Sequence, residues 1–489
     1  MWGRLPTCGG LLTRLPACLP TLLLSLSLHA QTPLEFQETR YEPRLGQPAK
    51  ISASRETLDF LRTAKTRRVE ISGAPAEGFV VAPNRSGEMV IAASSKVAPG
   101  EYHVTVTAAG ETGQERRADL TVAVQPRLTV PSGASRPPVV LLNGWEIGFT
   151  DTCPVAGNTS DDFGNLAQYL VSDGVPVVYL FDNCAEGPGQ TVETLGNDLA
   201  TLLNTIKYDT GAQVPQIDLV AFSLGGLIAR SYLAGLQSNG SLTPPSTTLI
   251  HKMVLIATPN FGSYLTESIA LNIPSGSQAS ELIPGSALQW NLANWNQRTD
   301  DLHGVSAIAI AGNAALYSVT SPTLGTQQLN NAGDGVVSLT SASIGFVQET
   351  ASQTRIVPYC HVDPSVFTNT AFGSYLCNAA GIVNITSASH PTSQIVRSFL
   401  AGTSDWQSIG SIPTSDPYLS VNGSMLFALV NGANAYASDL SSVTWGSVSL
   451  NNGGDLNTIY FGDFLQGTGV LQPVSASIGT VNCGSYAVA

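Results

Sequence analysis

Charged side chains are scarce in this chain. Only 12% of its 489 residues are Asp, Glu, Lys or Arg, and the formal net charge is −13. The basic residues gather at the start: residues 1–130 carry 15 Lys and Arg, whereas residues 131–489 carry 7 against 23 Asp and Glu. Because an acidic surface repels phosphate backbones, we expect no nucleic-acid partner. The apolar fraction of 43% is ample for a buried core, which argues against a disordered chain.

Long hydrophobic runs are missing as well. The most apolar stretch, residues 19–28, is too short to span a bilayer as a stable anchor. It follows Arg4 and Arg14 and precedes Ala30, an arrangement typical of a cleaved export signal. The sequence therefore predicts a signal peptide over residues 1–30 and a secreted, periplasmic or extracellular mature protein.

Cysteine is infrequent and lacks metal-site spacing. The chain has 7 cysteines, two of them in the predicted signal peptide, and none belongs to a CxxC or Cys/His cluster that would predict zinc. Two pairs are close enough in sequence to form local disulfides in an oxidising compartment, namely Cys153 with Cys184 and Cys360 with Cys377. Cys483 is left without an obvious partner.

The length predicts several domains. Within residues 45–128, two segments at 101–107 and 118–124 alternate apolar and polar side chains, which predicts a hairpin. The hairpin is typical of an immunoglobulin-like β-sandwich. A Pro-, Ser- and Gly-rich stretch at 126–138 follows as a linker. After residue 405 the helical patterns cease, and short strand-like segments at 424–430 and 458–461 stand among Gly, Asn and Ser turns. Residues 405–489 are therefore expected to form a small β-rich module of unknown role.

Residues 138–402 alternate between buried-strand and helix patterns. Continuous apolar runs are typical of parallel strands that are covered on both faces. The sequence therefore predicts an α/β domain with a doubly wound, mostly parallel sheet. The predicted strands are 139–142, 175–180, 217–222, 253–257 and 305–311, and the predicted helices are 163–171, 191–208 and 224–236.

Ser223 is the candidate nucleophile. It stands between the strand at 217–222 and the helix at 224–236, which is the setting of a nucleophile elbow. The backbones nearly touch at such a turn, so Ala221 and Gly225 fit as the small residues two before and two after the serine. The alternative is a Gly-rich helix start that merely packs against a sheet.

Asp334 is the candidate acid. A serine needs a base, and the base needs an acid that orients it, in the chain order Ser, acid, His for this kind of fold. Asp334 lies after the strand at 305–311 and is flanked by Gly333 and Gly335. The simpler interpretation is a turn residue. Asp363 is a weaker candidate acid because it follows His361 too closely to lie in a separate loop at a strand end.

The choice of base lies between two histidines. His390 precedes a predicted helix at 392–400 and follows a predicted final strand at 382–385, which is where the base of such a fold is expected. His361, next to Cys360, is the rival. On this context we predict His390. The other histidines of the mature chain are expected to be structural: His103, His251 and His303.

An oxyanion hole requires backbone N–H groups that point at the developing negative charge. Leu224, at the start of a helix, is expected to supply one of them. The loop after the strand at 139–142 is expected to supply the other from Trp145, with Glu146 as the less favoured alternative.

From about residue 138 to residue 400, the sequence resembles the α/β-hydrolase lipases, including the α/β domain of GPI-inositol deacylases. That resemblance implies hydrolysis of acyl esters through a covalent acyl-serine intermediate, without a cofactor. The matching motifs are Ala-Phe-Ser-Leu-Gly-Gly at 221–226, Ala-Thr-Pro-Asn-Phe-Gly-Ser at 257–263, Gly-Asp-Gly-Val-Val at 333–337 and Ser-His at 389–390.

Two positions depart from the family pattern. Asn143 replaces the histidine of the usual oxyanion motif, and Phe222 replaces the histidine that often precedes the nucleophile. Both departures concern the shape of the acyl pocket and not the triad. The apolar residues in 262–297 fit either a cap over an apolar substrate or ordinary core packing.

The expected partner is an ester or lipid substrate, with transient contact at a lipid surface. Two alternative functions are considered. The first is acyl transfer to an alcohol by the same triad. The second is a surface-binding or adhesion protein whose α/β domain has no catalytic activity.

Overall fold

The computed structural model describes residues 33–145, 153–263 and 277–296, then 302–344 and 354–362 with short gaps, then 385–403, and separate strands at 375–377 and between 418 and 482. Side chains in 315–329, 375–377 and 418–482 lie outside this description. So do the predicted signal peptide and Cys483. The predicted domain boundaries remain predictions.

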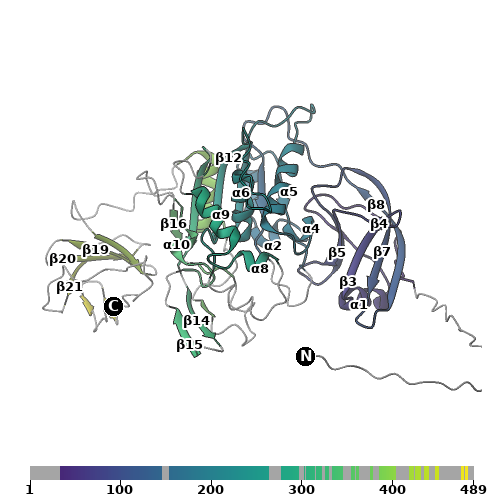
Figure 1. Ribbon diagram of the computed structural model, residues 1–489. Coiled ribbons are helices and arrows are strands. Elements are labelled where there is room, and N and C mark those ends of the chain that lie inside the picture. The colour runs from purple at the N-terminus through teal and green to yellow at the C-terminus, as the bar shows by residue number, and fades with distance from the viewer. Residues whose placement is uncertain are drawn as a thin grey trace, which may run out of the picture.

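The N-terminal part consists of two small sheets that pack against each other (Figure 1). The predicted hairpin is confirmed, with Val104 opposite Leu120 in antiparallel strands. Both sheets and helix α1 (Arg55–Thr63) contribute to one apolar core. The immunoglobulin-like identity remains a prediction. In order across each sheet, the strands are β1 (Arg40–Tyr41), β8 (Glu115–Val124), β7 (Gly100–Ala109), β3 (Thr66–Ile71) and β4 (Ala74–Pro75), and β2 (Ala49–Lys50), β6 (Met89–Ala93) and β5 (Phe79–Pro83).

The centre of the molecule is a six-stranded sheet in which every pair of neighbouring strands is parallel. This is the predicted α/β sheet. Across the sheet, the order is β10 (Val178–Phe181), β9 (Val139–Leu142), β11 (Ile217–Phe222), β12 (Ile250–Ile256), β13 (Ser306–Gly312) and β16 (Thr354–Val357).

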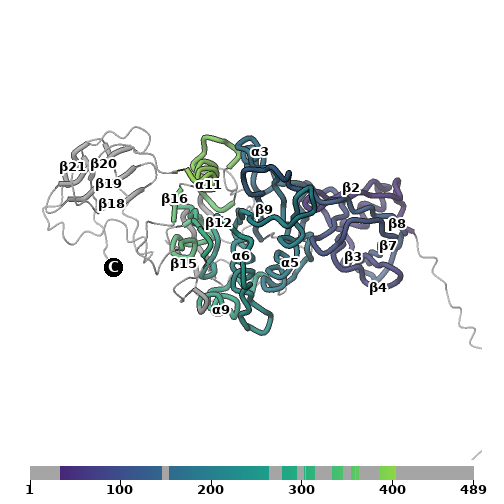
Figure 2. Tube along the Cα trace, turned by 90° about the horizontal axis from the view of Figure 1, so that it is seen from above, coloured from purple at the N-terminus to yellow at the C-terminus, as the bar shows by residue number. Residues whose placement is uncertain are grey.

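Helices cover both faces of this sheet, as Figure 2 shows from above. Side chains on a strand alternate between faces, so neighbouring residues of β9 join different cores. Val140 and Leu142 pack with the helices α5 (Val192–Thr205), α6 (Leu224–Ala234) and α9 (Ala287–Asn296). Val139 and Leu141 pack with α3 (Leu166–Ser172) and α11 (Pro391–Ala401). The unbroken apolar runs in the sequence are therefore strands that are buried on both faces.

The last strand of the sheet differs from the prediction. Residues 382–384 of the predicted final strand lie outside the described residues, and Ile385 is buried but is not in a strand. Instead, β16 pairs with β13 at the sheet edge. Its sequence, Thr-Arg-Ile-Val, carries no apolar run, because an edge strand is only half covered.

Additional short elements surround the two cores. A three-stranded sheet follows β13 in the order β15 (Gly325–Leu329), β14 (Ala315–Ser321) and β17 (Tyr375–Cys377). The short helices are α2 (Ser160–Phe163), α4 (Asn183–Glu186), α8 (Ser277–Glu281) and α10 (Leu339–Ala342).

The C-terminal strands form a six-stranded sheet. Its strand β19 (Met425–Val430) coincides with the segment predicted at 424–430. The segment predicted at 458–461 lies outside the described residues. The other strands are β18 (Tyr418–Asn422), β20 (Asn434–Asp439), β21 (Gly446–Leu450), β23 (Thr480–Asn482) and β22 (Ser475–Ser477).

The N-terminal sheets dock on the α/β domain through the segment around α4. Val90 and Ala92 of β6 share an apolar cluster with Val155, Cys184 and Ala185. Ion pairs and hydrogen bonds surround this cluster. They join Arg85 to Asp162, Lys96 to Asp198, and the Ser95 N–H and hydroxyl to the Glu186 carboxylate.

Among the helices that the structure describes, none combines the length and apolarity needed to cross a bilayer. Within the same residues, no group of three or more His, Cys, Asp or Glu side chains is placed to hold a metal ion.

Candidate active site

Ser223 occupies a strained turn between β11 and α6. Its backbone has φ 52° and ψ −121°, a conformation that non-glycine residues rarely adopt. The sharp turn lifts the side chain out of the sheet at the carboxyl end of β11. The small neighbours are needed for the predicted reason: a Cβ on Gly225 would lie 2.6 Å from the Leu142 carbonyl oxygen. Ser223 therefore stands on a nucleophile elbow.

Asp334 is fully buried and held by its own loop. Its Oδ1 accepts hydrogen bonds from the N–H groups of Val336 at 2.9 Å and Val337 at 2.7 Å. Its Oδ2 is left facing His361, whose Nδ1 lies 2.7 Å away. Asp334 therefore is a turn residue, as the flanking glycines suggest, and the same turn holds its carboxylate against His361.

His361 links the acid to the serine. Its Nε2 lies 3.0 Å from Ser223 Oγ, while its Nδ1 contacts Asp334 Oδ2. A carboxylate can only accept a hydrogen bond, so Nδ1 carries the proton and Nε2 of the neutral ring accepts from the serine hydroxyl. The Phe222 ring lies at a tilt beside the imidazole, with 5.0 Å between ring centroids. The His361 N–H also donates to the Asp334 carbonyl oxygen at 2.9 Å.

The structure corrects the prediction of His390 as the base. His390 is the N-cap of α11, and its Nδ1 accepts a hydrogen bond from the Thr392 N–H at 3.2 Å. Partial burial lowers the pKa of His390, which favours the neutral ring that this cap requires. The motif Ser-His-Pro before a helix therefore marks a helix start. His361, the rival in the sequence, takes the predicted place beside Ser223.

The position of the base follows from the identity of the last strand of the sheet. Because β16 is the edge strand, the loop at its carboxyl end carries the histidine, and that loop holds Tyr359, Cys360 and His361. A Cβ on Gly312, at the end of β13, would lie 2.7 Å from both Asp334 Cβ and the Tyr359 carbonyl oxygen. The acid loop and the histidine loop therefore meet directly.

The two predicted oxyanion donors flank the serine. Leu224 is the first residue of α6, where a backbone N–H has no partner within the helix. Trp145 follows Gly144, and Gly144 packs on the elbow, since a Cβ there would lie 3.1 Å from Ser223 Cβ. Glu146, the alternative donor, lies outside the described residues.

The cysteines follow the prediction in part. A disulfide joins Cys153 to Cys184, as predicted. Cys360 is also in a disulfide, but the side chain of its predicted partner Cys377 lies outside the description.

Of the three histidines expected to be structural, His251 pairs with Asp218 at the amino end of the sheet, with 2.9 Å between Nδ1 and Oδ1. His103 lies on β7, where its Nδ1 is 3.4 Å from the hydroxyl oxygen of Thr121. His303 lies outside the described residues.

Part of the predicted cap lies within the described residues. Residues 264–276 lie outside the description. Beyond them, Leu282, Leu288 and Leu292 are buried in the core beneath α6, which is the packing alternative, while Trp290 is 63% exposed. A cap over the site remains a prediction.

Residues 136–292 match the family model of class 2 lipases. The match contains Ser223 and Leu224, whereas Asp334 and His361 lie beyond it, so their assignment rests on geometry. Together with the parallel sheet, it identifies a lipase-like α/β fold and supports ester hydrolysis. The resemblance to lipases read from the motifs is confirmed. The narrower likeness to GPI-inositol deacylases remains a prediction.

Solved structures of bacterial lipases and phospholipases are similar to the chain at low identity. Bacillus licheniformis lipase BlEst2 is 16% identical, over 48% of this chain and 89% of that one, with a TM-score of 0.33. Legionella pneumophila phospholipase PlaB in complex with thio-NAD is 16% identical, over 54% and 58%, with a TM-score of 0.35, so the match spans just over half of PlaB. Lipase 1 from Pelosinus fermentans is 12% identical, over 55% and 98%, with a TM-score of 0.27. At these scores the likeness carries no argument about function. A comparison with curated proteins found no match.

Proposed function

We propose that this chain is a serine hydrolase of carboxylic esters, of the lipase or esterase type, that acts through an acyl-serine intermediate. The observation that carries the proposal is the hydrogen-bonded line from Ser223 through His361 to Asp334, with heavy-atom distances of 3.0 and 2.7 Å. Both distances are within reach for proton transfer in the free protein.

Acylation begins when Ser223 Oγ attacks the ester carbonyl carbon. His361 Nε2 takes the hydroxyl proton, and Asp334 stabilises the imidazolium through Nδ1–H. The carbonyl oxygen becomes negatively charged, and the N–H groups of Leu224 and Trp145 are its proposed donors. When the tetrahedral intermediate collapses, the bond to the alcohol oxygen breaks. His361 then returns the proton to the leaving alcohol.

Deacylation repeats these steps with water. His361 Nε2 takes a proton from water as its oxygen attacks the acyl carbon. Collapse of the second intermediate releases the carboxylic acid and restores the Ser223 hydroxyl. Every proton passes through one imidazole. For this reason, the proposal requires a single histidine within reach of the serine.

The decisive variant is Ser223→Ala, assayed with p-nitrophenyl esters of short and long acyl chains. We expect turnover to fall by at least about 10⁴-fold, because the residual rate comes only from binding and the oxyanion donors. The control is Ser172→Ala, which removes an exposed hydroxyl at the end of α3. Undiminished turnover in Ser223→Ala would refute the proposal, and the acyl-chain panel would identify the preferred substrate.

The same assay separates the alternatives. Adding an alcohol acceptor and analysing products distinguishes acyl transfer from hydrolysis. A surface-binding protein with an inert α/β domain would show no turnover in the wild type. The strained elbow and the ordered triad favour catalysis, since an inert domain gains nothing from that strain.

We also propose that the protein is exported. The basic and apolar segments within residues 1–30 support this proposal, and so does a disulfide between Cys153 and Cys184, which is expected in an oxidising compartment. Mass spectrometry of the protein after expression in a bacterium tests it. A mature N-terminus just after Ala30 is expected, and an intact N-terminus in the cytosol would contradict export.

A further inference from the structure

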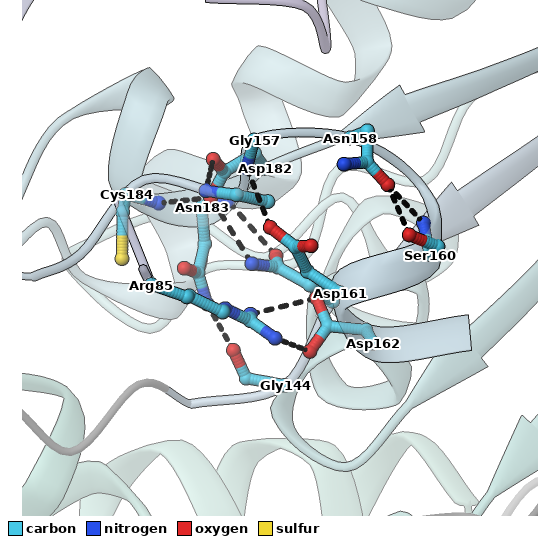
Figure 3. Close-up of polar contacts among 12 residues, drawn as sticks. Arg85, Gly144, Gly157, Asn158, Ser160, Asp161, Asp162, Asp182, Asn183 and Cys184 are labelled. Atoms are coloured by element: carbon cyan, nitrogen blue, oxygen red, sulfur yellow. Dashed lines mark hydrogen bonds and ion pairs between the residues drawn. The ribbon is translucent and has the colours of Figure 1, made fainter. Parts of the chain in front are cut away.

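A buried polar network lies next to the loop that follows β9 (Figure 3). This loop, residues 143–145, is called the oxyanion loop because it carries the Trp145 N–H. At the centre of the network, Asn183 Nδ2 donates a hydrogen bond to the Gly144 carbonyl oxygen at 2.8 Å. The Asn183 side chain is completely buried. It belongs to α4, directly after β10, while Gly144 follows the neighbouring strand β9. The contact therefore joins two adjacent loops at the carboxyl edge of the sheet.

This hydrogen bond determines the direction of the next N–H. The carbonyl of Gly144 and the N–H of Trp145 belong to one planar peptide group, in which they point in opposite directions. Holding the carbonyl toward Asn183 therefore aims the Trp145 N–H away from Asn183. Gly144 itself packs against Ser223, so this peptide lies next to the nucleophile.

The network also fixes Asn183. Asn143 Oδ1 accepts from the Asn183 N–H at 3.0 Å, and Asn143 Nδ2 donates to Asp182 Oδ1 at 3.0 Å. Asp182 further accepts from the N–H groups of Cys184 and Ala156, at 3.0 and 2.7 Å. Burial raises the pKa of Asp182 to about 6. Asn143, which replaces the histidine usual in the family, thus ties the oxyanion loop to α4.

Helix α4 is anchored at both ends. Cys184 is joined to Cys153 by the disulfide, and Glu186 accepts from the Ser95 N–H at 2.8 Å and from the Ser95 hydroxyl at 2.7 Å. Ser95 lies in the N-terminal part of the chain, just after β6. Asn183 is therefore held on a rigid support that includes the N-terminal sheets.

The side-chain amide of Asn183 makes its hydrogen bond through one of its two ends. Within the described part of the chain, its buried Oδ1 has no hydrogen-bond partner. Replacing Asn183 therefore removes its hydrogen bond to Gly144 and no other side-chain hydrogen bond among the described residues. The donor half of this amide is used on Gly144, and the acceptor half is left over.

We propose that Asn183 is a positioning residue that holds the Gly144–Trp145 peptide so that the Trp145 N–H serves the oxyanion hole. The inference rests on the proposed function of Ser223. It assigns Asn183 no direct contact with substrate; it acts through one backbone amide.

The test is Asn183→Leu, which has a similar size and no hydrogen-bond donor, with Asn183→Ala as the second variant. The probes are p-nitrophenyl butyrate and an alkyl trifluoromethyl ketone, which forms a tetrahedral oxyanion adduct with an active serine. We expect kcat to fall about 10- to 100-fold, which is less than the complete loss of a donor. KM should stay within about threefold, and Ki for the ketone should rise in parallel with the fall in kcat.

The control is His390→Ala, which removes the side-chain cap of α11 and none of the hydrogen bonds of α4 or of the loop after β9. It should lower the melting temperature without changing the ratio of ketone Ki to KM. Unchanged kcat in either folded Asn183 variant would overturn the inference, and so would a kcat loss with unchanged ketone Ki. These results differ from failure of the proposed function, in which the wild type would neither turn over ester nor bind the ketone as an adduct.

Discussion

Two loops of this protein each present a histidine, one after β16 and one before α11. The first ring joins an acid to a serine, and the second caps a helix. In the loop after β16, His361 is 4% exposed and uses both ring nitrogens, one on Asp334 and one on Ser223. In the loop before α11, His390 is half-buried and uses Nδ1 to cap a helix. No hydrogen bond or ion pair links His390 to a carboxylate within the described residues.

The difference shows that a catalytic histidine is defined by what holds it. An imidazole acts as a base when an acid fixes its tautomer and orientation. Asp334 does this for His361, and two backbone N–H groups hold Asp334 in turn. For His390, Nδ1 instead accepts a hydrogen bond from the backbone N–H of Thr392 at the start of α11.

The largest effect is expected from exchanging the two histidines for alanine. His361→Ala should lower kcat/KM by at least about 10⁴-fold, because the serine loses its base. His390→Ala should leave kcat/KM within about threefold of wild type. Steady-state kinetics with p-nitrophenyl butyrate measures both. The comparison fails if the two variants lose comparable activity while both remain folded.

The next largest effect on kcat is expected from Asp334, which contacts His361. Asp334→Asn keeps the shape but favours the wrong imidazole tautomer, so kcat should fall by about 10³- to 10⁴-fold. The control Asp119→Asn removes an exposed carboxylate on β8, and its kcat should match wild type. A loss of less than about tenfold in Asp334→Asn would show that the orientation of His361 does not depend on Asp334.

A smaller effect should appear in stability and only at the other loop. His390→Ala removes the side-chain cap of α11 and should lower the free energy of unfolding by about 1 kcal/mol. His390→Asn supplies another capping acceptor and should restore most of that loss. Urea denaturation followed by circular dichroism measures both. Equal stability of wild type and His390→Ala would refute the capping role.

The smallest effect is a pH dependence that distinguishes the cap from its replacement. Burial lowers the pKa of His390 below its ordinary value of 6.5, so the unfolded chain binds the proton more readily than the folded chain. The stability that the neutral His390 ring contributes is therefore fully present above pH 6.5. It is lost as the pH falls toward the lowered pKa of the folded state.

His390→Asn lacks that titration. When the pH is lowered from 7.5 to 5.5, wild type should therefore lose more unfolding free energy than His390→Asn does. Denaturation at both pH values provides the test, and a constant difference would show that His390 does not titrate with unfolding.

The sequence predicts well the parts of the fold that burial dictates. Strands β9 and β11 match the predicted bounds, since residues covered on both faces must be apolar. Ser223 was found because the elbow requires small neighbours at fixed positions. Asp334 was found because its loop requires glycines.

The sequence does not predict contacts between residues that are far apart in the chain. The half-covered strand β16 has no apolar run, and residues of β14 and β15 separate β13 from Asp334. Consequently the sequence predicts the final strand at residues 382–385, and with it His390 as the base. Asn183 was also missed, because its role depends on a contact with Gly144, 39 residues away. One sequence signal points toward His361: it stands next to Cys360, whose disulfide restrains the loop.

The most direct test measures the rate at which a fluorophosphonate probe labels Ser223, followed by intact mass and peptide mapping. Only a serine activated by a base reacts quickly with the probe. We expect wild type and His390→Ala to be labelled at Ser223 at similar rates, and His361→Ala not to be labelled on the same timescale. Rapid labelling of His361→Ala, or loss of labelling in folded His390→Ala, would contradict the assignment of His361 as the base.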